Sequence, residues 1–262
     1  MENDVNLQEK IIPAHQGCDV VVDMQNVKKS FGAQAVLKDV SLKLFKGENL
    51  VILGKSGSGK SVLIKCLVGL LNYDDGKLEV FGKDVASLKR KEMASMREKI
   101  GFLFQSGALY DSMTVKENLE FPLQRIKREL TKAEIIEKIA TVLEDVGLPE
   151  TLNKMPSELS GGMRKRISLA RTIILDPEIM LYDEPTTGLD PVTSDEISEL
   201  INKVKVRYKT SSIIITHDIN CAVKTADRMI MLKDGAVLME GNLNDFKNSD
   251  DDIIVSFFKV NS

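Results

Sequence analysis

The eight residues GKSGSGKS at positions 54–61 constrain the fold of this chain more than any other stretch. They match the pattern GxxxxGK[ST] and stand between an apolar run, NLVIL, and a second apolar run, KSVLIKCLVGLL. A strand that enters such a loop and a helix that leaves it are the context in which this motif binds nucleotide phosphates. The motif therefore predicts an α/β protein that holds a nucleoside triphosphate.

The residue types in this loop suit phosphate chemistry. Glycines let successive backbone N–H groups turn inward, and the helix N-terminus adds partial positive charge. Lys60 is expected to reach the β- and γ-phosphates, and Ser61 to offer its hydroxyl to Mg²⁺. A glycine-rich turn that merely precedes a helix would not explain Lys60 and Ser61 together. The expected nucleotide contacts are Gly54, Ser56, Gly57, Ser58, Gly59, Lys60, Ser61 and Val62.

A second candidate site follows the apolar run IMLY, where Asp183 and Glu184 stand side by side. Two adjacent acids at the end of a buried strand are costly to desolvate, so a purely structural role for the pair is disfavoured. Asp183 is expected to hold Mg²⁺ through water. Glu184 is expected to orient or deprotonate the attacking water. The sequence thus predicts hydrolysis of the bound nucleotide.

The remaining pattern indicates strands that alternate with helices. Strand-like runs occupy 19–31, 40–54, 76–82, 99–105, 178–185, 211–218, 228–235 and 236–241. Helical runs occupy 60–71, 87–99, 131–147 and 191–208, and Thr131 with Glu134 forms a candidate capping box. The interval from about 106 to 170 shows only helical periodicity. We therefore expect a parallel sheet interrupted by one helical insertion.

Length and composition limit the alternatives. A chain of 262 residues with 43% hydrophobic residues can bury one large α/β domain or two small ones. The net charge of -3 gives no global basic field for nucleic acid, and the three cysteines show no metal-binding spacing. The leader begins with acids and no apolar run approaches the roughly twenty residues that span a bilayer. We expect a cytoplasmic protein without a nucleic-acid partner.

A second glycine-rich helix start, LSGGM at 159–163, lies between the two candidate sites. With it, nearly the whole chain resembles the nucleotide-binding subunit of an ATP-binding cassette (ABC) transporter. The resemblance implies a RecA-like P-loop NTPase core with an antiparallel β edge and an inserted helical subdomain. The expected parts are a leader at 1–18, the core at 19–105 and 171–248, the helical subdomain at 106–170, and a tail at 249–262.

The resemblance also implies roles for residues outside the first loop. Phe31 stands where the family places an aromatic stacked on adenine, and His217 matches its γ-phosphate switch histidine. Gln105 stands in the loop that links nucleotide state to the membrane partner, and it joins Ser61 and Asp183 around Mg²⁺. Each has an alternative, since a lone Phe is more often core, a Gln can be an ordinary strand-end polar residue, and a lone His is usually structural. Their order and strand-end positions together outweigh these alternatives.

The second glycine-rich helix start is explained by the same resemblance. Ser160, Gly161 and Gly162 are implied to face the nucleotide of the opposite subunit in a homodimer, with Asp190 as a further contact between the chains. Physically, this is another helix N-terminus whose free N–H groups face an anion. The departure is Met163, where many family members carry glutamine, followed by the basic RKR. That change leaves the serine and the glycines in place.

The stretch FQSGALYDSMTVKENLEFPL at 104–123 resembles the ATPases of Mla-type and related MCE-protein lipid transport systems. It implies integral membrane permease subunits that dock near residues 105–125, with an MCE-domain lipid-binding protein and a small regulatory subunit as further partners. The protein would then lie on the inner face of the cell membrane. The alternatives are an ATPase that imports another solute, a non-transport ABC ATPase, and a nucleotide-binding regulator without hydrolysis. The tail run IIVSFF is expected to dock a partner or to pack on the core.

Overall fold

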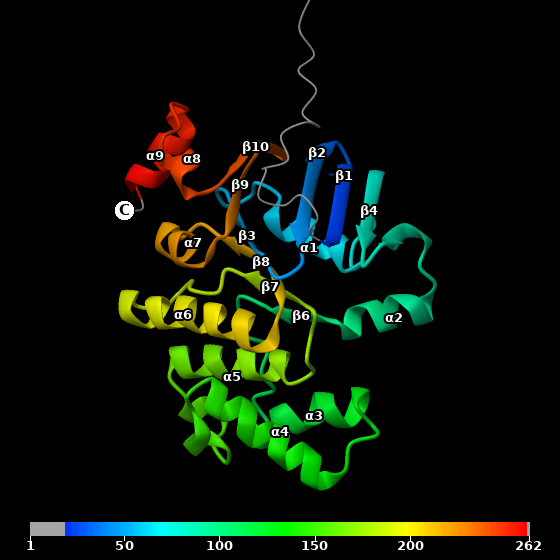
Figure 1. Cartoon of the computed structure of the whole chain (residues 1–262), viewed down its shortest axis with the longest axis vertical. Helices are drawn as coiled ribbons and strands as arrows, with labels where there is room; N and C mark the ends of the chain where they lie inside the picture. Colours follow the sequence, from blue (N-terminus) through cyan, green and yellow to red (C-terminus); the bar gives the residue numbers. More distant parts are fainter. Residues whose placement is uncertain (1–18, 261–262) are drawn as a thin grey trace, which may run out of the picture.

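The computed structural model describes residues 19–260, which build one ten-stranded mixed sheet with helices on both faces (Figure 1). The strand order is β5-β4-β1-β2-β10-β9-β3-β8-β7-β6. The strands are β1 (Val20–Phe31), β2 (Gln34–Phe45), β3 (Asn49–Leu53), β4 (Asp75–Val80), β5 (Lys83–Asp84), β6 (Ile100–Leu103), β7 (Ile179–Asp183), β8 (Ser211–Thr216), β9 (Arg228–Lys233) and β10 (Ala236–Gly241).

The sheet has an antiparallel half and a parallel half. β1 pairs antiparallel with β2 and β4, and β10 pairs antiparallel with β9. In the other half, β3 runs parallel to both β8 and β9, and β7 runs parallel to β6 and β8. The expected RecA-like core with an antiparallel edge is thus confirmed. The carboxyl ends of β3, β7 and β8 meet at one edge, which is where an α/β sheet of this kind binds ligands.

The central strands are buried on both faces because their sequences are continuous apolar runs. In β3, Leu50 and Ile52 point into one core, while Val51 and Leu53 point into the other. The first core is closed by α1 (Lys60–Leu67) and by Met96 of α2 (Arg90–Glu98), together with β1, β2 and β4. The second core is closed by the helices that follow β6.

Between β6 and β7 the chain is helical, as its periodicity predicted. This segment contains α3 (Val115–Ile126), α4 (Lys132–Asp145) and α5 (Gly161–Ile173), with 3-10 turns η4 (Pro149–Thr151) and η5 (Pro156–Glu158). Thr131 caps α4 by accepting from the Glu134 N–H, and the Glu134 carboxylate accepts from the Thr131 N–H, so the predicted capping box is confirmed. The three helices gather at the end of the molecule away from β1 and β2 (Figure 1).

Two of the remaining helices connect the parallel strands, and two more follow β10 at the end of the chain. They are α6 (Pro191–Tyr208), α7 (Ile219–Thr225), α8 (Leu243–Lys247) and α9 (Asp252–Val260), with a 3-10 turn η3 (Val85–Ser87) earlier in the chain. The tail run IIVSFF lies in α9 and packs on the core, where Ile254 and Phe257 are buried. The leader expected at 1–18 lies outside the described residues.

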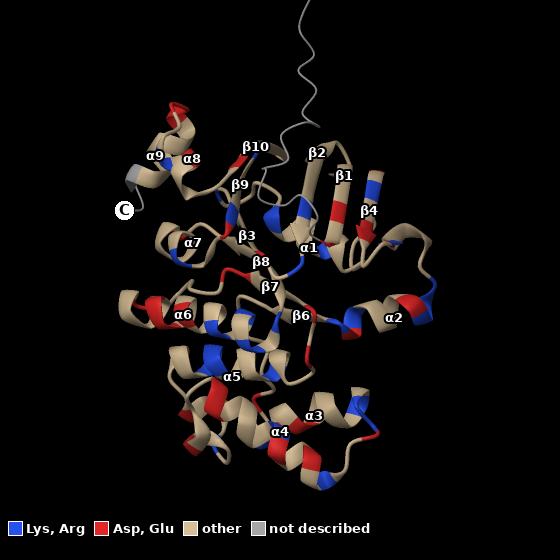
Figure 2. Ribbon diagram, in the orientation of Figure 1, with Lys and Arg blue, Asp and Glu red and all other residues tan. Residues whose placement is uncertain are grey.

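The surface helices carry both signs of charge. Figure 2 shows basic and acidic residues interspersed on α2 and α4, whereas on α6 the acidic residues precede the basic ones. In the described part of the chain, we find no helix with the length and apolar character needed to cross a bilayer.

Candidate functional site

The loop between β3 and α1 folds as its glycines require. Gly59 caps α1 with φ at 105°, a conformation that residues with a Cβ rarely adopt. A Cβ there would also lie 2.9 Å from the Val36 carbonyl oxygen. The Lys60 ammonium donates to the carbonyl oxygens of Gly54 at 2.6 Å and Lys55 at 3.1 Å. The loop therefore wraps tightly around the lysine at the start of α1.

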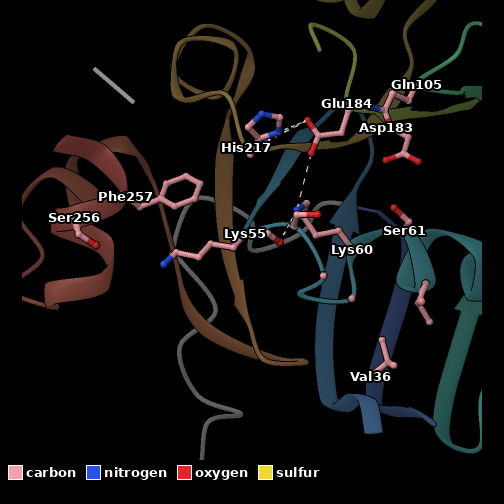
Figure 3. A pocket seen from close by; sticks show the side chains of 14 residues that line it. Val36, Lys55, Lys60, Ser61, Gln105, Asp183, Glu184, His217, Ser256 and Phe257 are labelled. Carbon is pink, nitrogen blue, oxygen red and sulfur yellow. Dashed lines mark hydrogen bonds and ion pairs between the residues drawn. The ribbon is translucent and has the colours of Figure 1, made fainter. Parts of the chain in front are cut away.

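A cavity of about 660 Å³ opens over this loop (Figure 3). Its volume is in the range of small-molecule and cofactor sites. Ten residues predicted from the sequence line it. They come from the loop after β3 and the start of α1, from the ends of β7 and β8, and from the loop after β6. They are Ser56, Gly57, Gly59, Lys60, Ser61, Val62, Gln105, Asp183, Glu184 and His217.

Glu184 occupies the centre of the polar contacts in this cavity. One carboxylate oxygen lies 2.8 Å from His217 Nδ1 and accepts from the Thr187 hydroxyl at 3.1 Å. The other lies 4.0 Å from the Lys60 ammonium. The Glu184 backbone is left-handed, with φ at 50°. Strained backbone of this kind clusters at functional sites, and here it directs the carboxylate toward Lys60 and His217 (Figure 3).

The Asp183 carboxylate and the Lys60 ammonium in the cavity influence each other's pKa values. Burial raises the pKa of Asp183 above its ordinary value, and the neighbouring Glu184 carboxylate raises it further, while nearby lysines oppose the shift. Burial lowers the pKa of Lys60, and Glu184 and Asp183 oppose that shift. Each group is thus desolvated but faces opposite charge. This arrangement suits a ligand that brings both negative phosphate and a cation.

The donor set also fits Mg²⁺. Ser61, Gln105 and Asp183 offer a hydroxyl, an amide oxygen and a carboxylate, and all three line the same cavity. Mg²⁺ prefers oxygen ligands and is often held by one or two carboxylates together with substrate phosphates. Within residues 19–260, no group of three or more His, Cys, Asp or Glu residues is arranged to hold a metal alone.

Three residues predicted to bind the nucleotide within the same chain do not line the cavity. Gly54 lies beneath the loop, where a Cβ would lie 2.5 Å from the Leu232 carbonyl oxygen. Ser58 is buried, and its N–H donates to the Lys55 carbonyl oxygen at 3.2 Å. Phe31 stands at the end of β1 with 47% of its surface exposed and the Lys29 ammonium 5.4 Å from its ring centre. Its ring is accessible to a ligand at the rim of the β1–β2 hairpin.

The residues predicted to act across subunits form a separate group. Ser160 caps α5 and accepts from the Met163 N–H at 3.2 Å, and the Met163 side chain packs on the core. Asp190 caps α6 by accepting from the Thr193 N–H. A Cβ on Gly162 would lie 2.5 Å from Thr193, so the starts of α5 and α6 touch. Within the described part of the chain, the cavity lining includes none of the four residues Ser160, Gly161, Gly162 and Asp190.

Four cavity residues were missed by the sequence analysis. Val36 comes from β2, Lys55 from inside the glycine loop, and Ser256 and Phe257 from α9. Figure 3 shows Phe257 and Lys55 on one side of the cavity and Ser61 and Asp183 on the other. Lys55 belongs to the recognised motif, whereas nothing in the local sequence indicates that Val36 or the tail reaches this site.

Known proteins show the same organisation. The family model described as "ABC transporter" matches residues 37–187, more than half of the chain. A curated relative, the chloroplastic Protein TRIGALACTOSYLDIACYLGLYCEROL 3 of Arabidopsis thaliana, is 38% identical over 256 residues, covering 91% of this chain and 73% of the relative. The probable ribonucleotide transport ATP-binding protein mkl of Mycobacterium leprae is 40% identical over 241 residues, covering 91% and 68%.

A solved structure extends the likeness to a nucleotide-bound state. The dimeric post-hydrolysis structure of the ATP-binding cassette MJ0796, bound to ADP and Pi, superposes with a TM-score of 0.77. The sequences are 34% identical, and the match covers 85% of this chain and 98% of that one. Together with the glycine loop, the acid pair and the fold, these likenesses identify the chain as a member of the ABC transporter family, an ATP-binding subunit with ATPase activity.

Proposed function

We propose that this chain works as a homodimer that hydrolyses two ATP molecules between its subunits and drives transport through separate membrane proteins. The observation that supports this most directly is that the predicted nucleotide contacts fall into two groups at different places on the chain. The cavity gathers the glycine loop, the acid pair and His217, whereas Ser160 and Gly162 are placed elsewhere on the chain. A second copy would supply the missing helix N-terminus, and the likeness to a dimeric cassette supports that arrangement.

In this proposal each cavity residue has a defined role. Lys60 and the loop N–H groups bind the phosphates, and Phe31 stacks on the adenine ring. Ser61, Gln105 and Asp183 would hold Mg²⁺, which supplies charge stabilisation to the transferring phosphoryl group when bound. Glu184 orients and deprotonates the attacking water, and its contact with His217 at 2.8 Å keeps the carboxylate facing the γ-phosphate.

The surface around Gln105 and the segment that follows it suits a membrane partner. Phe104 is 40% exposed and Tyr110 is 42% exposed, although both belong to residue types that are usually covered. The Tyr110 ring lies against Phe121 and the Arg171 guanidinium, which hold it in place at the surface. Leu109 packs on the core instead. We propose that the exposed aromatic residues dock the permease subunits.

For the cargo, we propose a lipid of the phospholipid class, carried by an Mla- or MCE-type system. The likeness of segment 104–123 to the ATPases of such systems supports this, and a relative whose name contains a galactosyl glycerolipid supports a lipid cargo in general. An MCE-domain lipid-binding protein and a small regulatory subunit would complete the complex at the inner face of the membrane. The relative named for ribonucleotide transport favours transport of a soluble solute as the second candidate.

The composite site can be tested with two inactive variants, Lys60→Ala and Ser160→Arg. If the signature of one chain completes the loop of the other, their heterodimer gathers both lesions into one site and leaves the second site whole. We expect isolated heterodimers to occlude one Mg-ATP and to recover part of the activity, whereas neither homodimer does. A folded heterodimer that occludes no nucleotide would show that each chain completes its own site.

The cargo class needs a separate experiment. The complex that co-purifies with this chain from membrane extracts should contain bound phospholipid by mass spectrometry. Its ATPase should support ATP-dependent phospholipid transfer between vesicles. A complex that moves no lipid and whose ATPase responds only to a soluble solute would instead favour the second candidate.

A further inference from the structure

Lys165, in the helix α5 that Ser160 begins, is a charged residue with no part in the roles assigned above. Only 6% of its surface is exposed. Its ammonium lies 2.9 Å from the carbonyl oxygen of Gln105 and 3.4 Å from that of Phe104. A third carbonyl, that of Glu184, lies 3.5 Å away. A buried ammonium is costly unless its N–H groups find acceptors, and here the Gln105 carbonyl oxygen accepts a short bond while the other two carbonyl oxygens complete the polar surroundings.

The contact between Lys165 and Glu184 involves a residue whose backbone is strained. Glu184 is left-handed at φ 50°, a conformation that non-glycine residues keep only with support from their surroundings. Its N–H donates to the Ile215 carbonyl oxygen at 2.8 Å, and its own carbonyl faces Lys165. The peptide groups on both sides of the Glu184 Cα are therefore fixed by other elements, and the direction of the carboxylate follows from them.

The contact with Gln105 belongs to a wider interface between α5 and the loop after β6. Lys165, Ser168 and Arg171 are spaced three apart, so they share one face of the helix. The Arg171 guanidinium donates to the Ala108 carbonyl oxygen at 2.7 Å. A Cβ on Gly107 would lie 2.7 Å from the Ser168 hydroxyl, so the loop runs directly against this face. Of the three side chains, Lys165 is the one that also reaches Glu184.

We propose that Lys165 is a positioning residue for ATP hydrolysis, which holds the backbones of Gln105 and Glu184 in one fixed arrangement. The inference rests on the proposed roles of Gln105 at Mg²⁺ and of Glu184 at the attacking water. Because α5 begins at Ser160, Lys165 also joins the segment that faces the neighbouring nucleotide to the segments that act on its own.

The test compares Lys165→Met, which keeps the length of the side chain but removes the donors, with Lys165→Arg, which keeps charge and donors. In the full-length dimer we expect Lys165→Met to lower kcat on the order of 10- to 100-fold, because small displacements of positioned groups have effects of that size. Affinity for a fluorescent ATP analogue should stay unchanged, and Lys165→Arg should recover most of the rate. Combining Lys165→Met with Gln105→Ala should give less than the product of the two losses.

Arg166→Met is the matched control on the same helix. Arg166 contacts the Val146 carbonyl oxygen and Glu196 rather than the loop after β6, so its kcat should remain near that of the wild type. Wild-type kcat in folded Lys165→Met, or an equal loss in Arg166→Met, would overturn the inference. So would a loss confined to nucleotide affinity.

Two further results keep the outcomes separate. If a melting curve shows Lys165→Met to be unfolded, Lys165→Gln takes its place, because its shorter side chain has only two N–H donors for the three carbonyl oxygens. A kcat equal to that of Lys165→Arg would then overturn the inference, since the full set of contacts would be dispensable. Absence of phosphate release from the wild-type protein would instead count against the proposed function, before any variant is compared.

Discussion

Gly162 gives the sharpest prediction about stability, because the structure leaves no room for one more carbon there. A Cβ at this position would lie 2.5 Å from the Thr193 methyl carbon. Thr193 cannot easily turn away, because its hydroxyl donates to one Asp190 oxygen at 2.5 Å and its N–H donates to the other at 3.0 Å. Gly162→Ala must therefore shift the start of α6 or break the cap on that helix.

The neighbouring glycine supplies the reference for the magnitude. A Cβ on Gly161 would lie 3.7 Å from Leu189, an ordinary contact. Gly161→Ala should therefore show only the usual gain of replacing glycine in a helix, about 0.5 to 1 kcal/mol. Gly162→Ala should add an overpacking cost of about 1 to 3 kcal/mol to the same gain. The difference in unfolding free energy between the two variants isolates the clash, about 1 to 3 kcal/mol.

Urea unfolding and melting curves of the two variants measure this difference. Taking the middle of each range, Gly162→Ala should lose about 1 kcal/mol, or roughly 2 to 4 °C in Tm. Thr193→Ser removes the methyl group and keeps the hydroxyl bond to Asp190, so the double variant should regain the loss. If Gly162→Ala is as stable as Gly161→Ala, the argument that α5 and α6 leave no room for a methyl group at Gly162 is wrong.

Two further predictions concern activity and assembly. Glu184→Gln should keep ATP affinity and lower turnover by about 10² to 10⁴, because it removes a positioned base and preserves the side-chain shape; phosphate release at the wild-type rate would refute the role of Glu184. Tyr110→Glu should abolish co-purification of the permease, while the isolated chain still hydrolyses ATP. The control is Ile136→Glu, at a 60% exposed site on α4, which should leave the complex intact. Equal recovery of the complex with both variants would place the docking surface elsewhere.

The sequence predicted the parallel sheet, its helical insertion and eight of the ten cavity residues because their signals are local, whereas Gln105 and His217 were implied by the family resemblance. The loop at 54–61 and the acids after IMLY each carry their chemistry within eight residues or fewer, and the strand periodicity places both at the edge of one sheet. These features depend on short-range pattern and on the general geometry of parallel sheets. A single chain therefore suffices to find them.

The rest could not be predicted, because it depends on contacts between distant segments. Phe257 reaches the cavity although it lies about two hundred residues after the glycine loop, and the run around it was open to docking or to packing. Lys165 stands in a basic triplet, RKR, that suggests a solvated surface, yet tertiary packing buries it against three carbonyl groups. Gly162 was expected to meet a ligand, and its contact with Thr193 adds a packing reason for the same glycine.

The placement of β3 between β8 and β9 has a consequence for synthesis of the chain. Val51 pairs with Ile214 on one side and Met229 on the other, so both neighbours of this fully buried strand are made more than 160 residues later. At about 5 to 20 residues per second, the ribosome leaves NLVIL without its native partners for roughly 8 to 35 s. An unpaired apolar strand is the kind of segment that associates with other chains. Recovery of soluble protein should therefore depend on chaperones that cover this strand during translation, even though the finished fold hides it completely.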